Sequence, residues 1–301
     1  MRKTNKITPS DLLSLNIRYE NTKWAREDQE RVGHLVRRMS LLEKEEKELI
    51  IKLTDQFCYI DYSVIPLYLE KTFKNFLSSS QCYKFIIAPL KSPFLSSIET
   101  DTVGRKLTQK TKSSDLCYTI FKNTFIKSKY PKGLHFCFCD TPQDIKQNFK
   151  NTYKIAFIDD FIGSGETAVE KINEYLSYFQ CEGVNVNASQ LCIVVIIAMK
   201  EGIDYINSHI KKVNSYCYLS KQKGITGSPD LNTKSNVDLM KSIENKVLQK
   251  LNRKFSFGYK SSESLVSIME KSPNNTFPFY WYKGKDGQNG ELEPIFRRNI
   301  E

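Results

Sequence analysis

The sequence lacks the patterns that mark zinc sites. It has 301 residues but only three histidines, and its eight cysteines include no Cys-x-x-Cys pair. Several cysteines stand in apolar runs, as in Cys137-Phe138-Cys139, where a free thiol behaves as a small hydrophobic side chain. These absences argue against a structural zinc site.

Long hydrophobic runs are also missing. Residues 1–10 are polar and basic, without the apolar stretch of a secretion signal. The longest apolar run, Leu191–Met199, is too short to span a bilayer. We therefore expect a cytoplasmic protein with reduced cysteines and no membrane attachment.

The charges are unbalanced. The chain has 45 Lys and Arg residues against 34 Asp and Glu residues, a formal charge of +11. Such an excess favours polyanionic ligands or partners, such as nucleotides or nucleic acid. A solvated basic surface explains it equally well. With 40% hydrophobic residues, the chain can form a packed core in one large domain or two modest ones.

The most informative stretch is Lys154–Ala168, Lys-Ile-Ala-Phe-Ile-Asp-Asp-Phe-Ile-Gly-Ser-Gly-Glu-Thr-Ala. Its apolar run, Ile155–Ile158, predicts a strand buried on both faces of a parallel sheet and ending at two carboxylates. A Gly-Ser-Gly turn follows, and apolar residues then recur at helical spacing from Ala168 to Leu176. Strand, acid pair, glycine turn and helix together predict one ligand-binding unit.

The turn has the composition of an anion site. Gly163 and Gly165 allow main-chain N–H groups to converge on an anion at the positive end of the following helix. Ser164 and Thr167 add hydroxyl donors. A nucleoside-triphosphate P-loop is excluded because no lysine follows Gly165.

The two acids complete the predicted site. Asp159 and Asp160 are expected at the carboxyl end of the strand, where carboxylates accept hydrogen bonds from sugar hydroxyls. The predicted ligand therefore carries a phosphate and a vicinal diol. The plainer alternative is a strand whose acids only cap the next helix, although one acid or hydroxyl is enough for a cap.

The run from Ile155 to Thr167 resembles the phosphoribosyl pyrophosphate (PRPP) signature of the phosphoribosyltransferases. Both have four hydrophobic residues, two acids, two further hydrophobic residues and a small-residue loop that ends in Thr. The resemblance implies that Asp159 and Asp160 hold the ribose as catalytic and metal-binding residues, and that the loop cradles the 5′-phosphate. The implied phosphate-binding residues are Gly163, Ser164, Gly165, Glu166 and Thr167. Glu166 departs from the family, which often has Gly or Lys at this position. A carboxylate near a phosphate is unfavourable unless its side chain points away into solvent.

Two further segments are candidates for anion binding. A strand expected over Tyr83–Leu90 runs into Lys91 and Ser92, and in the resembling family the loop after the first core strand binds pyrophosphate. The second candidate segment is Lys112-Ser113-Ser114, which directly precedes a helix expected over Asp115–Phe125. Capping of that helix explains these residues equally well.

Helical and strand patterns predict the architecture. An apolar stripe among charged residues over 16–77 predicts helices, and alternating strands and helices follow. The predicted fold is α/β, a Rossmann-like, mainly parallel sheet of the phosphoribosyltransferase type flanked by helices, with a helical N-terminal extension. The expected domains are residues 1–80, helical, and residues 81–301, phosphoribosyltransferase-like. The expected strands are Tyr83–Leu90, Leu134–Cys139, Ile155–Ile158, Ser189–Met199 and Ser215–Leu219.

The end of the chain extends the resemblance. A Gly-Tyr pair at Gly258 is followed by the motif Pro-Asn-Asn-Thr-x-Pro-x-x-Trp, which begins at Pro273. Together with the helical start and the PRPP-type strand, it looks like the phosphoribosyltransferase-like proteins of bacterial conflict systems, found beside anti-phage genes that include retron reverse transcriptases. Asn274 and Asn275 either bind a base edge or form a turn, and the turn is slightly favoured.

The resemblance implies a toxin or effector that acts on nucleotides or PRPP by glycosyl transfer or by cleavage of an N-glycosidic or pyrophosphate bond. It implies Mg²⁺ as the cofactor and, as a partner, a reverse transcriptase with noncoding RNA or DNA; an oligomer is compatible with it. Two alternatives are a catalytically inactive nucleotide-sensing module and a nucleic-acid-binding partner protein that uses the basic surface.

Overall fold

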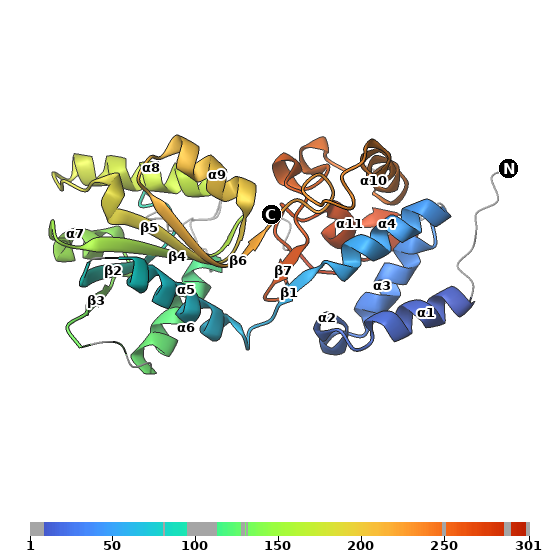
Figure 1. Cartoon of the computed structure of the whole chain (residues 1–301), viewed down its shortest axis with the longest axis horizontal. Helices are drawn as coiled ribbons and strands as arrows, with labels where there is room; N and C mark the ends of the chain where they lie inside the picture. The colour runs from blue at the N-terminus through green and yellow to red at the C-terminus, as the bar shows by residue number, and fades with distance from the viewer. Residues whose placement is uncertain are drawn as a thin grey trace, which may run out of the picture. The chain divides into compact units, whose positions relative to one another are not determined.

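The structure is a computed structural model and describes most of the chain (Figure 1). The described residues are 9–80, 82–94, 113–127, 130, 132–248, 251–285 and 290–298. The chain divides into two compact units: one combines Met1–Tyr62 with Gln222–Glu301, and the other consists of Ser63–Lys221. Along the chain, the second unit is therefore inserted between the two segments of the first.

The second unit contains a parallel sheet. Its strands are β2 (Lys84–Pro89), β3 (His135–Phe138), β4 (Lys154–Ile162), β5 (Leu191–Met199) and β6 (Asn214–Lys221). They follow the spatial order β3-β2-β4-β5-β6, and every neighbouring pair is parallel. Strand β5 is buried along its whole length, as its unbroken apolar sequence requires. The predicted α/β fold with a mainly parallel sheet is confirmed.

Helices cover both faces of this sheet (Figure 1). They are α5 (Ile65–Ser79), α6 (Ser113–Lys127), α7 (Pro142–Asn148), α8 (Glu166–Cys181) and α9 (Lys200–His209), with a short 3-10 helix over Ala188–Gln190. Helices α5 and α6 pack on one face, where Phe76 of α5 contacts Phe85 of β2. Helices α7, α8 and α9 lie on the other face, where Phe157 of β4 packs against Tyr175 of α8, with ring centroids 4.5 Å apart.

Strand β4 is longer than predicted. It extends to Ile162 because its last residues still pair with β5. On its other side, β2 stops at Pro89, whose partner in β4 is Ile158. The prediction that the strand ends before the acids is therefore wrong: Asp159 and Asp160 lie inside β4, beside β5 and beyond the end of β2.

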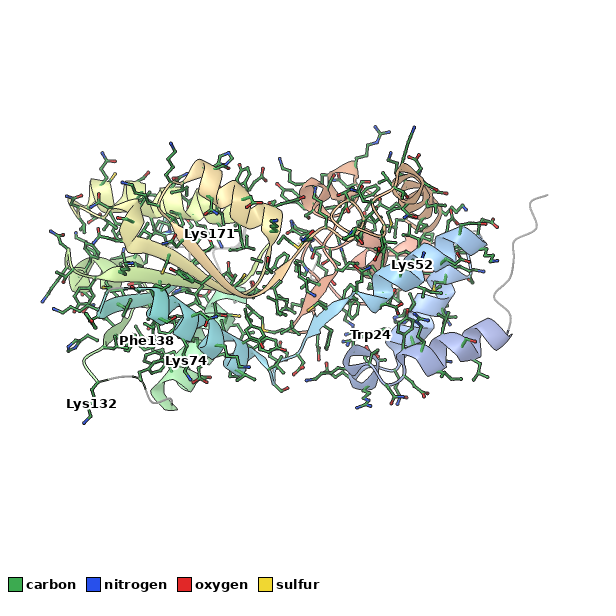
Figure 2. All side chains as sticks on the ribbon, in the orientation of Figure 1. Trp24, Lys52, Lys74, Lys132, Phe138 and Lys171 are labelled. Atoms are coloured by element: carbon green, nitrogen blue, oxygen red, sulfur yellow. The ribbon has the colours of Figure 1, made fainter. Side chains whose placement is uncertain are left out.

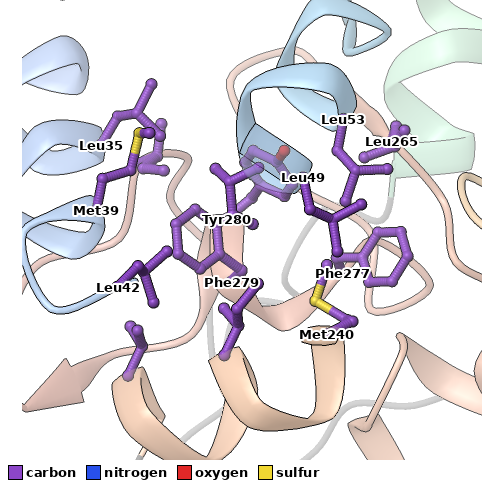
Figure 3. Close-up of a cluster of buried hydrophobic side chains, with 14 of the residues drawn as sticks. Leu35, Met39, Leu42, Leu49, Leu53, Met240, Leu265, Phe277, Phe279 and Tyr280 are labelled. Atoms are coloured by element: carbon purple, nitrogen blue, oxygen red, sulfur yellow. The ribbon is translucent and has the colours of Figure 1, made fainter. Parts of the chain in front are cut away.

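The first unit is mainly helical, as predicted for its N-terminal part. Its helices are α1 (Pro9–Tyr19), α2 (Lys23–Glu27), α3 (Glu30–Met39), α4 (Lys44–Asp55), α10 (Lys234–Val247) and α11 (Pro278–Trp281), with 3-10 helices over Arg253–Phe255 and Tyr259–Ser261. Short strands pair as β1 (Cys58–Ile60) with β7 (Val266–Ile268), in parallel, and β8 (Gly284–Lys285) with β9 (Glu291–Leu292), antiparallel. Figure 3 shows its apolar core, which includes Leu35, Leu49, Met240, Phe279 and Tyr280.

Arg38 of α3 joins the N-terminal helices to the end of the chain. Its side chain is 0% exposed, and its guanidinium group donates to four main-chain carbonyl groups at 2.6–3.2 Å. The planar fork of five N–H donors suits such a set of acceptors. The carbonyl groups belong to Phe279, Tyr282, Leu292 and Glu293.

The two compact units differ from the predicted division at residue 80. Helix α5 packs on the sheet, so it belongs to the unit that contains the strands. The segment after Lys221 packs with the N-terminal helices instead, through contacts such as those of Arg38. Both features depend on contacts between residues far apart in the sequence.

The Pro-Asn-Asn-Thr motif forms a turn, which confirms the favoured interpretation. The Thr276 N–H donates to the carbonyl oxygen of Pro273 at 3.1 Å. The Thr276 hydroxyl donates to Val266 O, and the Trp281 indole N–H donates to Thr276 O, both at 2.7 Å. Asn275 donates to the Ser262 hydroxyl at 3.0 Å. The motif therefore holds the C-terminal segment together.

All eight cysteines are free thiols. Among the described residues, each helix is either too short or too polar to serve as a membrane span.

Candidate functional site

The sheet order creates a switch point between β2 and β4. These strands are neighbours, but the chain leaves β2 through α6 on one face of the sheet and leaves β4 through α8 on the other. Doubly wound sheets bind ligands at such a point, outside the carboxyl ends of the strands. Asp159 and Asp160 lie there, because β2 ends one residue before the level of Asp159.

Asp159 is buried and faces α8. Its side chain accepts a hydrogen bond from the Asp160 N–H at 3.0 Å, and its other oxygen lies 3.9 Å from the Lys171 ammonium nitrogen. Lys171, labelled in Figure 2, also donates to the main-chain oxygen of Leu90 at 2.8 Å. Burial raises the pKa of Asp159 well above its ordinary value, and the charge of Lys171 opposes that rise.

Asp160 is half-buried, and its side chain forms hydrogen bonds with Asp159 and with Ser113 of α6. Burial raises its pKa, while hydrogen bonds with Asp159 and with Ser113 of α6 lower it. The buried Cys117 of α6 lies close to both acids, and burial together with their charges raises the pKa of its thiol. The adjacent acids thus interact with each other, and each has a further partner on a helix, Lys171 of α8 for Asp159 and Ser113 of α6 for Asp160.

The predicted phosphate loop packs directly on α9. Gly165 has a φ of 84°, in the left-handed region that favours glycine, and precedes the first residue of α8. A Cβ added at Gly165 would lie 2.4 Å from the Gly202 carbonyl oxygen. A Cβ added at Gly202 would lie 2.1 Å from the Gly163 carbonyl oxygen. Glycine at these positions allows the main chains of the loop and of α9 to touch.

Several main-chain donors at the start of α8 have no hydrogen-bond partner among the described residues. No described residue accepts a hydrogen bond from the N–H groups of Ser164, Gly165, Thr167 and Ala168. Thr167 is exposed, and Glu166 is half-buried. Open amides at the positive end of a sixteen-residue helix have the geometry that binds a phosphate or another anion.

The other predicted anion-binding residues lie on two neighbouring segments. Lys91, just after β2, forms an ion pair with Asp115 of α6 at 3.0 Å, and the Ser92 hydroxyl accepts a hydrogen bond from the Phe94 N–H at 3.3 Å. Ser113 is the first residue of α6. Lys112 lies outside the described residues.

Two residues of this region were missed by the sequence analysis. The sequence does contain a signal for Lys171. It lies three residues after Ala168 and four before Tyr175, within the buried stripe of α8, where a lysine indicates a partner for its charge. Gly202 is a weaker signal, since a glycine in the first turn of α9 indicates a close main-chain contact but not its partner.

The acids fit a magnesium ion only in part. The described residues contain no group of three or more His, Cys, Asp or Glu side chains that could hold a metal. Mg²⁺ needs only one or two protein carboxylates when substrate phosphates supply further oxygens. Asp160 suits that arrangement because it is less buried than Asp159 and has no lysine among its hydrogen-bond partners.

Comparisons with known proteins identify the family. No curated protein matches the chain. Among solved structures, the chain is similar to the APRTase from Giardia lamblia complexed with 9-deazaadenine, with 12% identity, 51% of this chain and 77% of that chain covered, and a TM-score of 0.29. The sequence model of the PRTase-CE family matches residues 40–298. The match takes in most of the chain, which therefore belongs to the PRTase-CE family and is a phosphoribosyltransferase-like protein.

Proposed function

We propose that the second unit binds a 5-phosphoribosyl group, in PRPP or in a nucleotide, and breaks or transfers the bond at its anomeric carbon. One observation carries the proposal. The open N–H groups at the start of α8 and the two carboxylates of β4 lie within one strand-turn-helix segment at the switch point of the sheet. This combination matches a ligand with an anionic end and neighbouring hydroxyls.

In this proposal the loop binds the 5′-phosphate. Ser164, Gly165 and Thr167 donate main-chain hydrogen bonds, and the hydroxyls of Ser164 and Thr167 add two more. The main chain of Gly202 packs against the loop, so the N–H donors of the loop are in place before the ligand binds. Binding energy from the phosphate then orients the distant reacting carbon.

The acids bind the ribose and stabilise charge. Asp159 and Asp160 accept hydrogen bonds from the 2- and 3-hydroxyls of the sugar. When the bond at the anomeric carbon breaks, positive charge develops on the ring, and a fixed carboxylate nearby favours that charge. Lys91 and Ser92, beyond the end of β2, bind the departing diphosphate or phosphate, for which Lys91 must leave Asp115.

Where the ligand carries a diphosphate, Asp160 and Asp159 are the residues that would hold Mg²⁺. The ion would neutralise charge on the leaving group. The protein itself supplies the phosphate loop, the sugar-binding acids and the lysine after β2.

The test is calorimetric titration of the purified chain with PRPP and with nucleotides, with mass spectrometry of the same samples. Wild-type protein is expected to bind and to release a free base or pyrophosphate. The Asp159→Asn, Asp160→Asn double variant is expected to lose turnover, whereas Asp204→Asn, an exposed carboxylate of α9, retains it. Full turnover in the double variant would contradict the catalytic role of the acids.

A sensor without catalysis is the second candidate. It is favoured by Glu166, an acidic residue in the first turn of α8, because a negative charge there weakens the binding of the 5′-phosphate on which the catalytic proposal depends. Binding that leaves every ligand chemically unaltered over long incubation would support the sensor and contradict the proposed catalytic function.

For the cell we propose an effector that depletes nucleotides in defence against phage and is held inactive by a partner complex. The support is the resemblance of the PRPP-type strand and the Pro-Asn-Asn-Thr segment to conflict-system proteins. Expression of the wild type is expected to change cellular nucleotide pools and to slow growth, and the double Asp variant is expected to do neither. Unchanged nucleotide pools and growth on wild-type expression would contradict this role.

A further inference from the structure

One segment of the first unit carries cations without any acid. Residues 245–262 include five Lys and Arg residues and no Asp or Glu. The acids that flank the segment, Glu244 and Glu263, are only 4% and 3% exposed. Three of the five cations are exposed, namely Arg253, Lys254 and Lys260. This segment therefore presents positive charge to solvent.

Two aromatic rings lie among these cations. Phe255 and Tyr259 are half-buried and belong to consecutive 3-10 helices that contact each other. The Lys254 ammonium lies 4.8 Å from the centre of the Phe255 ring, and the Lys260 ammonium lies 6.0 Å from the centre of the Tyr259 ring. Each ring therefore has a cation within the range of a cation–π contact.

Arg298 adds a guanidinium group from the C-terminal segment. Its central carbon lies 5.6 Å from the centre of the Phe255 ring and 4.7 Å from that of Trp281. Trp281 is buried, and its indole N–H donates to Thr276 O, so this ring is fixed. Together these side chains form what we call the basic aromatic surface. Its members are Arg253, Lys254, Phe255, Tyr259, Lys260 and Arg298.

The main chain that carries this surface is held in a strained conformation. Its φ angle lies between 48° and 58° at four residues with side chains, which disfavour these values: Phe257, Lys260, Ser261 and Glu263. The Glu244 carboxylate accepts hydrogen bonds from the Ser256 hydroxyl at 2.6 Å and the Phe257 N–H at 2.8 Å. An added Cβ at Gly258 would lie 2.0 Å from Asn275 O. Strain of this kind persists only where surrounding contacts fix it, and it is common at segments that bind ligands.

We propose that the basic aromatic surface binds single-stranded nucleic acid. Its cations pair with backbone phosphates, while its two rings and the Arg298 guanidinium offer flat faces on which unpaired bases stack. In a duplex these base faces are already covered by neighbouring base pairs, so single strands bind more tightly. An anionic membrane fits less well, because the exposed large apolar side chains of the described residues all lie outside residues 245–298. The proposal concerns the first unit and does not depend on the sugar site of the second.

The experiment measures the fluorescence anisotropy of a labelled oligothymidylate of about twelve nucleotides, titrated with the purified full chain at several salt concentrations. A duplex of the same length and vesicles that contain anionic lipid are titrated in parallel. One variant removes charge, Arg253→Gln with Lys254→Gln. Its control is Lys44→Gln with Lys52→Gln, which changes two exposed lysines of α4.

A second set of variants removes rings and keeps the charges. These variants are Tyr259→Leu and Phe255→Leu, made separately so that one remains informative if the other does not fold. Tyr62→Leu is the control, because Tyr62 is a 48% exposed ring of the first unit outside the basic aromatic surface. Circular dichroism checks that each variant folds.

Wild type is expected to bind the single strand more tightly than the duplex, with an affinity that falls as salt rises. The charge variant should lose about tenfold in affinity and depend less on salt. The ring variants should also lose about tenfold, but with the salt dependence of the wild type, because stacking does not release counterions. Both controls should match the wild type.

Four results would overturn the proposal. They are equal affinity for duplex and single strand, binding to vesicles without binding to the oligonucleotide, and ring variants that bind as the wild type does. The fourth is displacement of the oligonucleotide by excess ribose 5-phosphate at matched ionic strength, which would place the oligonucleotide in the second unit.

Discussion

Gly202 of α9 lies so close to Gly163 that a Cβ at position 202 would stand 2.1 Å from the Gly163 carbonyl oxygen. Real Cβ atoms do not approach main-chain oxygens to this distance, so either the loop or the helix must move to accept a side chain. The contact joins the loop that follows β4 to the helix α9 that follows β5. It makes the position of the proposed phosphate loop depend on a residue nearly forty positions away in the sequence.

Gly202→Ala is expected to displace the loop. The phosphate affinity should fall by about tenfold or more, with a loss of stability of about 1–3 kcal/mol from the forced main-chain shift. The measurements are calorimetry with ribose 5-phosphate and urea unfolding. Gly33→Ala is the matched control, because a Cβ at that position meets nothing within 4 Å. Equal affinity in both variants would mean that the loop does not bind the phosphate.

Asp159→Asn is expected to change how stability depends on pH. Because burial raises the pKa of Asp159, the folded protein binds this proton more tightly than the unfolded chain does. The free energy of unfolding of the wild type therefore falls as pH rises from the ordinary pKa of Asp through the raised value. The variant lacks this loss, so its stability relative to wild type should grow over that range. Urea unfolding at several pH values tests this, and a difference that is independent of pH contradicts it.

Glu166→Lys is expected to tighten phosphate binding. It replaces a carboxylate by a cation in the first turn of α8, where the N–H groups of the loop are open. The gain should be about tenfold, or about 1.4 kcal/mol, and should shrink with added salt. Glu170→Lys makes the same change at an exposed position one turn later, beyond the reach of the helix end. If both variants bind alike, the phosphate does not lie at the start of α8.

Arg38→Met is expected to destabilise the first unit strongly. It leaves four carbonyl groups, two buried and two partly buried, without their donor, at a cost of about 3–5 kcal/mol in the free energy of unfolding. Arg38→Lys should recover only part of this loss, because an ammonium group has three donors in a different geometry. Arg37→Met, at the exposed neighbouring position, should change the stability little. Chemical unfolding distinguishes the three variants, and an equal effect at positions 37 and 38 refutes the role of Arg38.

The sequence predicted the sheet and the glycine turn before α8 well, because both depend on local patterns. Apolar runs such as Ile155–Ile158 mark buried strands, and Gly-Ser-Gly before a helix marks a turn with converging N–H groups. The predicted end of that strand was wrong because the length of β4 is set by its pairing with β5, which local sequence does not show.

The remaining features depend on distant contacts. Lys171 reaches Leu90, which precedes it by 81 residues, and Arg38 reaches carbonyl groups more than 240 residues later. A charged residue within a buried helical stripe was the available signal in both helices. That signal shows that a partner exists, but only the structure identifies it. The grouping of residues 222–301 with the N-terminal helices could not be predicted for the same reason.

The most direct test of the account is a crystal structure of the wild-type protein with ribose 5-phosphate. The account predicts the phosphate within hydrogen-bond distance of the Gly165 and Thr167 N–H groups and the 2- and 3-hydroxyls on the carboxylates of Asp159 and Asp160. A phosphate bound elsewhere, with the start of α8 left open, would contradict it.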